Sequence, residues 1–204
     1  MFRVEDKIPL NGLELSKAMT VLEKNKAKIL FPRRLISSIY FDNFHLDMFL
    51  ESEEGISPRK KIRIRTYNNS FKKILLEKKI SSPEGRYKSS EQITDLKMNF
   101  YLKNGFLDKD YGQCFPITEV VYSRDYYSFK EVRITIDTKI KYRQFNKKNF
   151  ISSDKNVMEF KPNKQDNLEI VEDLLLGRKA RFSKYVFSVL DNQILQKRNS
   201  IFIK

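Results

Sequence analysis

The segment RKKIRIRTY at 59–67 alternates basic and apolar side chains. Successive side chains of a β-strand point to opposite faces of the sheet, so four basic residues share one face: Arg59, Lys61, Arg63 and Arg65. Cations so close together repel one another unless water or an anion lies beside them. The segment therefore predicts a strand with one apolar face and one strongly cationic face.

The same spacing of polar residues recurs along the chain. A glutamate stands two positions before a lysine in three places, at Glu5, Glu77 and Glu159. Tyr122 stands two positions before Arg124 in the same way. In a sandwich the charged face would be an outer surface, which explains any single strand. A closed barrel with a polar bore and an apolar outer face explains all of these strands together. Arginine forks in such a bore suit phosphate oxygens, and the carboxylates suit a hard divalent cation.

The remaining pattern predicts an α+β fold. Residues 12–27 read as an amphipathic helix capped by Asn11, 89–108 are mixed, and 168–197 are helical with a break at Gly177. Strands are predicted at 2–10, 36–42, 59–67, 71–80, 117–129, 131–140 and 157–162. The expected architecture is a single domain spanning 1–204: a closed antiparallel β-barrel padded by helices, with further helices at the C-terminal end.

Charge and cysteine content narrow the classes of partner. The 204 residues include 40 Lys+Arg against 26 Asp+Glu, a formal net charge of +14, so an anionic partner is expected. Nucleic acid, an acidic membrane surface and phosphorylated small molecules all remain open on composition. Cys114 is the one cysteine and predicts a core thiol in a reducing compartment. No apolar run approaches the roughly 20 residues of a membrane span, and no signal-peptide pattern is evident. A cytoplasmic protein is expected, associating with membranes only through a partner.

Eight segments, taken in order, resemble the catalytic domain of the vacuolar transporter chaperone (VTC) complex and its bacterial relatives, within the CYTH or triphosphate tunnel metalloenzyme superfamily. They are FRVEDK at 2–7, ISSIYFD at 36–42, RKKIRIRTY at 59–67, LEKK at 76–79 with YKSS at 87–90, VVYSRDYY at 120–127, VRITID at 132–137, VMEFK at 157–161 and RFSKYVFSV at 181–189. The resemblance implies an antiparallel barrel whose tunnel binds triphosphate.

The resemblance also implies roles for individual residues. Catalytic positions are Lys7, Arg124 and Lys184, and Glu159 matches the carboxylate that binds Mn²⁺ or Mg²⁺. Glu5 and Glu77 match acidic positions of the bore. Arg3 stands where broader superfamily members carry the first glutamate of the first strand, which favours the polymerase branch over the hydrolytic branch. The implied substrate-binding residues are Arg63, Arg65, Lys79, Lys88, Tyr122, Arg133, Lys161 and Ser183.

The activity implied is an ATP-dependent polyphosphate polymerase, which transfers the γ-phosphate of ATP to a growing polyphosphate chain. The expected partners are ATP, triphosphate or polyphosphate, and no nucleic acid. Three alternatives remain: a hydrolase of tripolyphosphate or nucleoside triphosphates with the same fold, a non-catalytic polyphosphate-binding module, and a nucleic-acid-binding domain. The last predicts basic residues spread over one outer surface, whereas the tunnel predicts convergence. Neither the acceptor, the product length nor the oligomeric state follows from the sequence.

Overall fold

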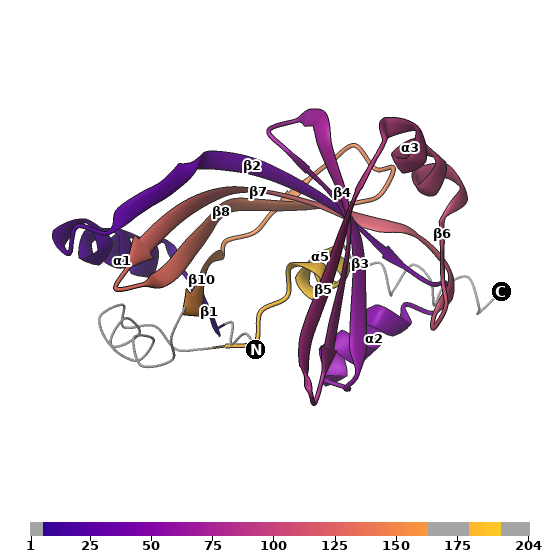
Figure 1. The fold of residues 1–204 in the computed structure, drawn as a ribbon, viewed down its shortest axis with the longest axis horizontal. Coiled ribbons are helices and arrows are strands. Elements are labelled where there is room, and N and C mark those ends of the chain that lie inside the picture. Colours follow the sequence, from indigo (N-terminus) through magenta and orange to yellow (C-terminus); the bar gives the residue numbers. More distant parts are fainter. Residues whose placement is uncertain (1–5, 163–179, 193–204) are drawn as a thin grey trace. The chain divides into compact units, whose positions relative to one another are not determined.

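The computed structural model describes residues 6–162 and 180–192, which form ten strands and four helices (Figure 1). The helices are α1 (Gly12–Lys24), α2 (Asp47–Glu54), α3 (Asp95–Asn104) and α5 (Lys184–Asp191). The strands are β1 (Asp6–Leu10), β2 (Lys28–Asp42), β3 (Arg59–Tyr67), β4 (Ser70–Ser82), β5 (Gly85–Ile93), β6 (Phe106–Asp108), β7 (Gly112–Phe129), β8 (Val132–Gln144), β9 (Ile151–Ser152) and β10 (Asn156–Pro162). The predicted α+β class is confirmed. The helical prediction for 168–183 and 193–197 lies largely outside the described residues.

The strand pairing follows an open path. Its order is β1-β10-β8-β7-β2-β3-β4-β5, with β6 added to β7 and β9 added to β8. Within the described residues β1 and β5 do not pair, so the expected closed barrel is not confirmed. The closure was inferred from the alternation of charges, and alternation fixes the face of each side chain but not the pairing of the outermost strands. Among the described residues, no helix is long and apolar enough to cross a membrane.

The chain divides into two compact units, each assembled from separated stretches of sequence. Unit 1 contains residues 6–35, 122–140, 152–162 and 180–182, and unit 2 contains 36–121, 141–151 and 183–192. The long strands β2, β7 and β8 contribute residues to both units. Each unit is described separately below.

In unit 1, helix α1 covers an apolar face made by β1, β10 and β8. Asn11 caps this helix in a reciprocal box with Glu14: the Glu14 amide donates to Asn11 Oδ1 at 2.9 Å and the Asn11 amide donates to Glu14 Oε2 at 2.8 Å. The apolar positions of the helix and strands then meet in one buried cluster. Its members are Ile8, Leu10, Ala18, Leu22, Val132, Ile134, Ile136, Met158 and Phe160. Because alternate residues of β8 and β10 are buried here, the intervening polar residues lie on the other face of the sheet.

In unit 2, strands β3, β4 and β5 pair in sequence as an antiparallel meander, and β2 pairs with β3. Ile62 and Ile64 are 0% and 1% exposed, so the apolar face predicted for 59–67 is buried as expected. Helix α5 lies beside α2 (Figure 1). Tyr185 joins them, because its ring stacks on Tyr40 and meets Phe49 edge to face.

Candidate functional site

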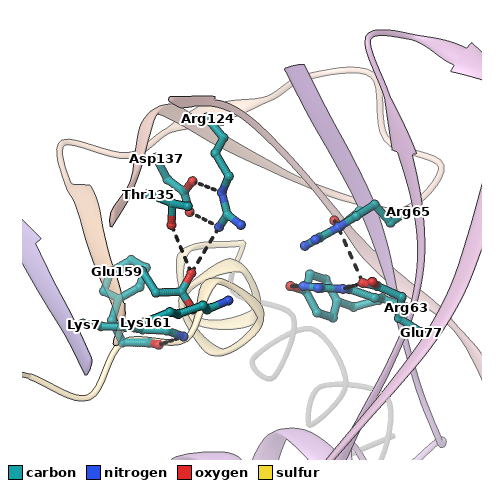
Figure 2. A network of polar contacts seen from close by, with 12 residues as sticks. Lys7, Arg63, Arg65, Glu77, Arg124, Thr135, Asp137, Glu159 and Lys161 are labelled. Carbon is teal, nitrogen blue, oxygen red and sulfur yellow. Dashed lines mark hydrogen bonds and ion pairs between the residues drawn. The ribbon is translucent and has the colours of Figure 1, made fainter. Parts of the chain in front are cut away.

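Glu159 of β10 is a buried carboxylate that its neighbours among the described residues hold only loosely. Its residue is 6% exposed. Thr135 Oγ1 and Arg124 Nη2 lie 3.4 and 3.5 Å from Glu159 Oε2, and Lys161 Nζ lies 3.5 Å from Oε1 (Figure 2). The antiparallel register places Thr135 of β8 directly opposite Glu159. Contacts of this length are at the outer limit of hydrogen bonding, so the oxygens keep capacity for a stronger ligand.

Arg124 is held by a different carboxylate. Its Nε and Nη2 donate to the two oxygens of Asp137 at 2.5 and 2.7 Å, a bidentate pair (Figure 2). Burial would lower the pKa of Arg124, but the charge of Asp137 outweighs it and raises the pKa well above the usual value. The guanidinium lies 5.4 Å from the ring centre of Tyr122, which is 1% exposed. Arg124 is therefore a fixed, permanently charged group beside Glu159.

Three further predicted cations of unit 1 lie on β1, β8 and β10 near this carboxylate. Lys7 of β1 pairs directly opposite Glu159 and donates from Nζ to the Phe182 carbonyl at 3.2 Å. Lys161 is 41% exposed in its side chain and pairs opposite Arg133 of β8, which is itself exposed. Lys7, Arg124, Arg133 and Lys161 thus belong to one face of the unit 1 strands, with Glu159 among them.

In unit 2, Glu77 of β4 gathers three cations. Arg63 Nε donates to Glu77 Oε2 at 2.7 Å, and Arg65 Nε lies 3.7 Å from the same oxygen (Figure 2). Lys88 Nζ forms an ion pair with Glu77 Oε1. The Glu77 side chain is 2% exposed. Burial would raise its pKa, but the charges of Arg63, Arg65 and Lys88 prevail and lower the pKa to about 2. The Glu77 carboxylate is therefore fully engaged in ion pairs and holds two arginines in place.

Residues of β2 accept further hydrogen bonds from Arg63 and Arg65. Ser38 pairs opposite Arg65 and accepts a hydrogen bond from its Nε at 3.2 Å. Tyr40 pairs opposite Arg63, and its hydroxyl accepts from Arg63 Nη1 at 3.1 Å. The sequence motifs predict no phosphate-binding role for Ser38 or Tyr40. Their alternation with the apolar residues of 36–42 was visible, but the pairing with β3 was not.

The first turn of α5 carries Ser183 and Lys184 in unit 2. Ser183 caps the helix by accepting from the Val186 amide at 3.3 Å, and it also accepts from Lys61 Nζ at 2.8 Å. Lys61, Lys79 and Lys88 lie side by side across β3, β4 and β5. Such directly opposed like charges are destabilising unless an acidic group or a bound anion lies near them.

The predicted residues thus form one group in each unit. Five of the predicted cations, which a tunnel would bring together, divide between the two groups: Arg124, Arg133 and Lys161 belong to unit 1, and Arg63 and Arg65 belong to unit 2. Their common convergence stays a prediction. Glu5 lies outside the described residues. Cys114 is buried, and its burial together with the charges of Asp42 and Asp108 raises the thiol pKa to about 12, as suits a core thiol.

The chain belongs to the VTC domain family, whose model matches residues 4–191. The resemblance inferred from the eight sequence segments is therefore confirmed. A search of curated proteins finds no match.

Solved structures share the fold at low sequence identity. A candidate adenylate cyclase from Bacillus halodurans is 11% identical with a TM-score of 0.63, covering 89% of this chain and 94% of that one. The PH1012 protein from Pyrococcus horikoshii is 14% identical with a TM-score of 0.59, covering 90% and 97%. HpAC1 from Hippeastrum, a candidate adenylyl cyclase with a dominant triphosphatase activity, is 15% identical with a TM-score of 0.56, covering 93% and 96%. These likenesses establish a shared fold.

Glu159 fits a divalent cation that is shared with a phosphate ligand. Within the described residues, no three His, Cys, Asp or Glu side chains gather as a complete protein cage for a metal. Mg²⁺ and Mn²⁺ at phosphoryl-transfer sites need no such cage, since one or two carboxylates, water and substrate phosphates suffice. Because the contacts of Glu159 are 3.4–3.5 Å long, its carboxylate can supply that one ligand.

Proposed function

We propose that this protein is an ATP-dependent polyphosphate polymerase. It transfers the γ-phosphate of ATP to the terminal phosphate of a polyphosphate chain and releases ADP. The observation that carries the proposal is Glu159: a buried, loosely held carboxylate beside Arg124 and Lys161. Membership of the VTC domain family supports a phosphate chain as the acceptor.

The chain's own residues supply positioning and positive charge, which is most of what phosphoryl transfer requires. Arg124 is kept charged by Asp137 and offers a planar donor edge to phosphate oxygens. In unit 2 Arg63 and Arg65 are held in fixed orientations by Glu77, so little side-chain freedom is lost when an anion binds. Lys7, Arg124 and Lys184 are the proposed catalytic cations. The proposed substrate ligands are Arg63, Arg65, Lys79, Lys88, Tyr122, Arg133, Lys161 and Ser183.

Glu159 would hold the divalent cation, Mn²⁺ or Mg²⁺, which when bound neutralises phosphate charge and increases the electrophilicity of the phosphorus. Lys161 and Arg124 flank the carboxylate and balance its charge before the nucleotide arrives. The negative charge of Glu159 opposes an anion by itself, so this carboxylate would serve the phosphates only by holding the cation. Glu159 is for this reason dispensable for holding an anion but required for metal-dependent turnover.

A triphosphate hydrolase is the second candidate function. It is favoured by the shared fold with HpAC1, which has a dominant triphosphatase activity. The same cations would then orient a phosphate chain while water attacks in place of the acceptor phosphate. The polymerase and the hydrolase differ only in the nucleophile, so the products formed show which activity the protein has.

The deciding experiment incubates the purified chain with ATP and Mn²⁺ and assays one sample twice, by gel staining for polyphosphate and by orthophosphate release. Polyphosphate with ADP and little orthophosphate is expected. Orthophosphate alone would replace the proposal with the hydrolase. Tight triphosphate binding without either product would indicate a binding module. Glu159→Gln should abolish turnover, whereas Glu91→Gln, which removes an exposed carboxylate paired with Lys97, should leave it unchanged.

A further inference from the structure

The start of β2 in unit 1 is an exposed apolar segment. Ile29, Leu30 and Phe31 are 74%, 39% and 41% exposed. Successive side chains of a strand point to opposite faces, so these apolar side chains reach solvent on both faces of the strand end. Phe31 also meets the buried Tyr126 of β7 edge to face, with ring centres 5.5 Å apart, which anchors the segment to the unit. Contiguous exposed apolar side chains of this kind are typical of an interaction site.

Positive charge surrounds this apolar segment. Residues 23–34 contain five basic residues and one acidic residue, Glu23. Lys24, Lys26 and Lys28 are exposed, and among the described residues none of these three lysines forms an ion pair with a carboxylate. Lysines without a local counterion repel one another and favour an anionic partner. The charge of this segment is therefore left for a partner outside the chain.

We call residues 24–31 the basic–apolar tip; it runs from the last residue of α1 into the start of β2 (Figure 1). Strand β2 pairs with β7 on one side, and its pairing with β3 on the other side begins at Ile36. Within the described residues of unit 1, the stretch before Ile36 thus has one unpaired edge. Pro32 lies on this stretch and lacks the amide that an added strand needs, and edge lysines also discourage strand addition. A second copy would oppose like charges, so neither a copy nor an added strand suits the tip.

A bilayer that contains anionic lipid complements both parts of the tip. Its headgroups attract lysines near the surface, and its acyl chains accept apolar side chains. A soluble polyanion such as polyphosphate offers charge but no hydrocarbon for Ile29 and Leu30. Three residues of a strand span about 10 Å, and interfacial segments bury their apolar side chains about 5–10 Å into the boundary of headgroups and acyl chains. The tip therefore has the length and composition to enter one leaflet without spanning the membrane.

We propose that the basic–apolar tip docks unit 1 on a membrane surface rich in anionic lipid. The three apolar side chains enter the interface, and the three lysines contact the headgroups. This docking is independent of the proposed phosphotransferase activity, because the tip contains none of the residues assigned to catalysis or substrate binding. It differs from the sequence-based expectation that a membrane is reached only through a partner protein.

The chain has no tryptophan, so a single introduced tryptophan reports on its own surroundings. Ile29→Trp places this probe in the tip, and Leu107→Trp places it on β6 of unit 2, at a position with the same 74% exposure. Vesicles of equal amounts of phosphatidylcholine and phosphatidylserine should shift the fluorescence of Ile29→Trp to the blue. Lipids brominated along the acyl chain should quench that fluorescence. Leu107→Trp should show neither change.

Vesicle co-sedimentation measures the partition of the tryptophan-free chain onto the same vesicles. Lys26→Gln and Lys28→Gln should each lower this partition about fivefold, the effect of one cation near an anionic surface, and added salt should reduce the difference. Ile29→Ser should lower it about tenfold at low and high salt alike, because the lost contact is apolar. The matched controls Lys103→Gln on α3 and Leu107→Ser on β6 change exposed residues elsewhere and should partition like the wild type.

Unchanged fluorescence of Ile29→Trp on vesicles, or equal shifts in both tryptophan variants, would overturn the tip as the docking site. Equal partition of the wild-type chain onto vesicles of phosphatidylcholine alone would overturn the preference for anionic lipid. Long polyphosphate or a thymidine oligonucleotide that binds the wild-type chain, and loses affinity in Lys26→Gln, would identify a soluble polyanion instead if the vesicles do not bind. Circular dichroism confirms that each variant is folded. None of these readouts uses ATP turnover, so failure of the proposed activity would leave the docking test intact.

Discussion

Glu77 in unit 2 and Glu159 in unit 1 have the same sequence context and opposite environments. Each stands on a strand, two positions before a lysine, and is buried in the folded chain. Glu77 is bound by Arg63 at 2.7 Å and by Lys88, whereas the contacts of Glu159 with the described residues are 3.4–3.5 Å long. The pattern Glu-x-Lys therefore does not distinguish a structural counterion from a candidate metal ligand.

The difference arises from a second carboxylate in unit 1. Asp137 accepts from Nε and Nη2 of Arg124 at 2.5 and 2.7 Å, so Glu159 has only a 3.5 Å contact with Nη2, which it shares with Asp137. In unit 2, Glu77 itself performs the role that Asp137 performs in unit 1. Asp137 and Glu77 each orient the arginines beside them, and unit 1 has Glu159 as a further carboxylate to offer to a metal.

The largest effect expected from this comparison is on stability. Glu77→Gln should lower the free energy of unfolding by about 3–5 kcal/mol, because it leaves Arg63 and Arg65 without their buried counterion. Glu159→Gln should change it by less than about 1 kcal/mol, since its contacts are long. Urea unfolding followed by circular dichroism measures both. Equal losses in the two variants would contradict the distinction.

The pH dependence of stability should separate two carboxylates of unit 2. The pKa of Glu77 is lowered to about 2, so its contribution is present above its usual pKa and is lost as pH falls towards 2. Burial raises the pKa of Asp42 to about 6, despite hydrogen bonds from the Tyr185 hydroxyl and the Met48 and Phe49 amides. Its contribution is present at acidic pH and is lost as pH rises through 6. Each shift corresponds to roughly 3 kcal/mol.

Two variants show which carboxylate causes each change of stability with pH. Glu77→Gln should flatten the loss of stability below about pH 4.5, near the usual glutamate pKa. It should not alter the change of stability that Asp42 causes at higher pH. Asp42→Asn should do the reverse, flattening the change between about pH 4 and 6. Denaturant midpoints collected from pH 2 to 8 provide the measurement. A wild-type profile without a fall below pH 4 would mean that Glu77 is not held as a carboxylate by its three cations.

A smaller effect is expected on ligand affinity. Arg65→Ala removes a buried guanidinium, and should weaken metal-free tripolyphosphate binding about 10- to 100-fold, or about 1.5–3 kcal/mol. Arg143→Ala is the matched control, because that arginine is balanced by Glu119 at 2.5 Å. The Arg143→Ala variant should bind tripolyphosphate with the same affinity as the wild type. Isothermal titration at fixed ionic strength distinguishes the two, and equal losses would show nonspecific screening.

The sequence predicted the fold class and most strands because their alternation is local. The strand at 59–67 matches β3, and the helix predicted at 12–27 is α1, with the expected Asn11 cap. The strand predicted at 36–42 is longer and begins at Lys28, where Pro32 and two arginines obscure the alternation. Helix α2 was not predicted. It is stabilised by Asp42, whose side chain accepts from the Met48 and Phe49 amides, a contact between residues outside any periodic pattern.

For the site, residue types and strand faces could be predicted from the sequence, but the partners of each side chain depended on strand register. Arg63 and Arg65 were predicted to be on a polar face, yet Tyr40 and Ser38 oppose them only through the β2–β3 pairing. Lys60 was missed altogether. It shares a face with Ile62 and Ile64 and is 5% exposed, because Asp108 and Asp110 accept from its ammonium at 2.7 and 2.5 Å. The bonded residues are 48 and 50 positions apart in the chain, so no local sequence pattern predicts these contacts.

The most direct test of the account is Mn²⁺ binding in the presence of tripolyphosphate, measured by electron paramagnetic resonance on the wild-type chain, Glu159→Gln and Glu77→Gln. The account predicts that Glu159→Gln loses the protein-bound Mn²⁺ signal while still binding tripolyphosphate without metal. Glu77→Gln, where folded, should retain the signal, because its carboxylate serves the arginines. Retention of bound Mn²⁺ by Glu159→Gln together with its loss in Glu77→Gln would contradict the assignment of the metal to unit 1.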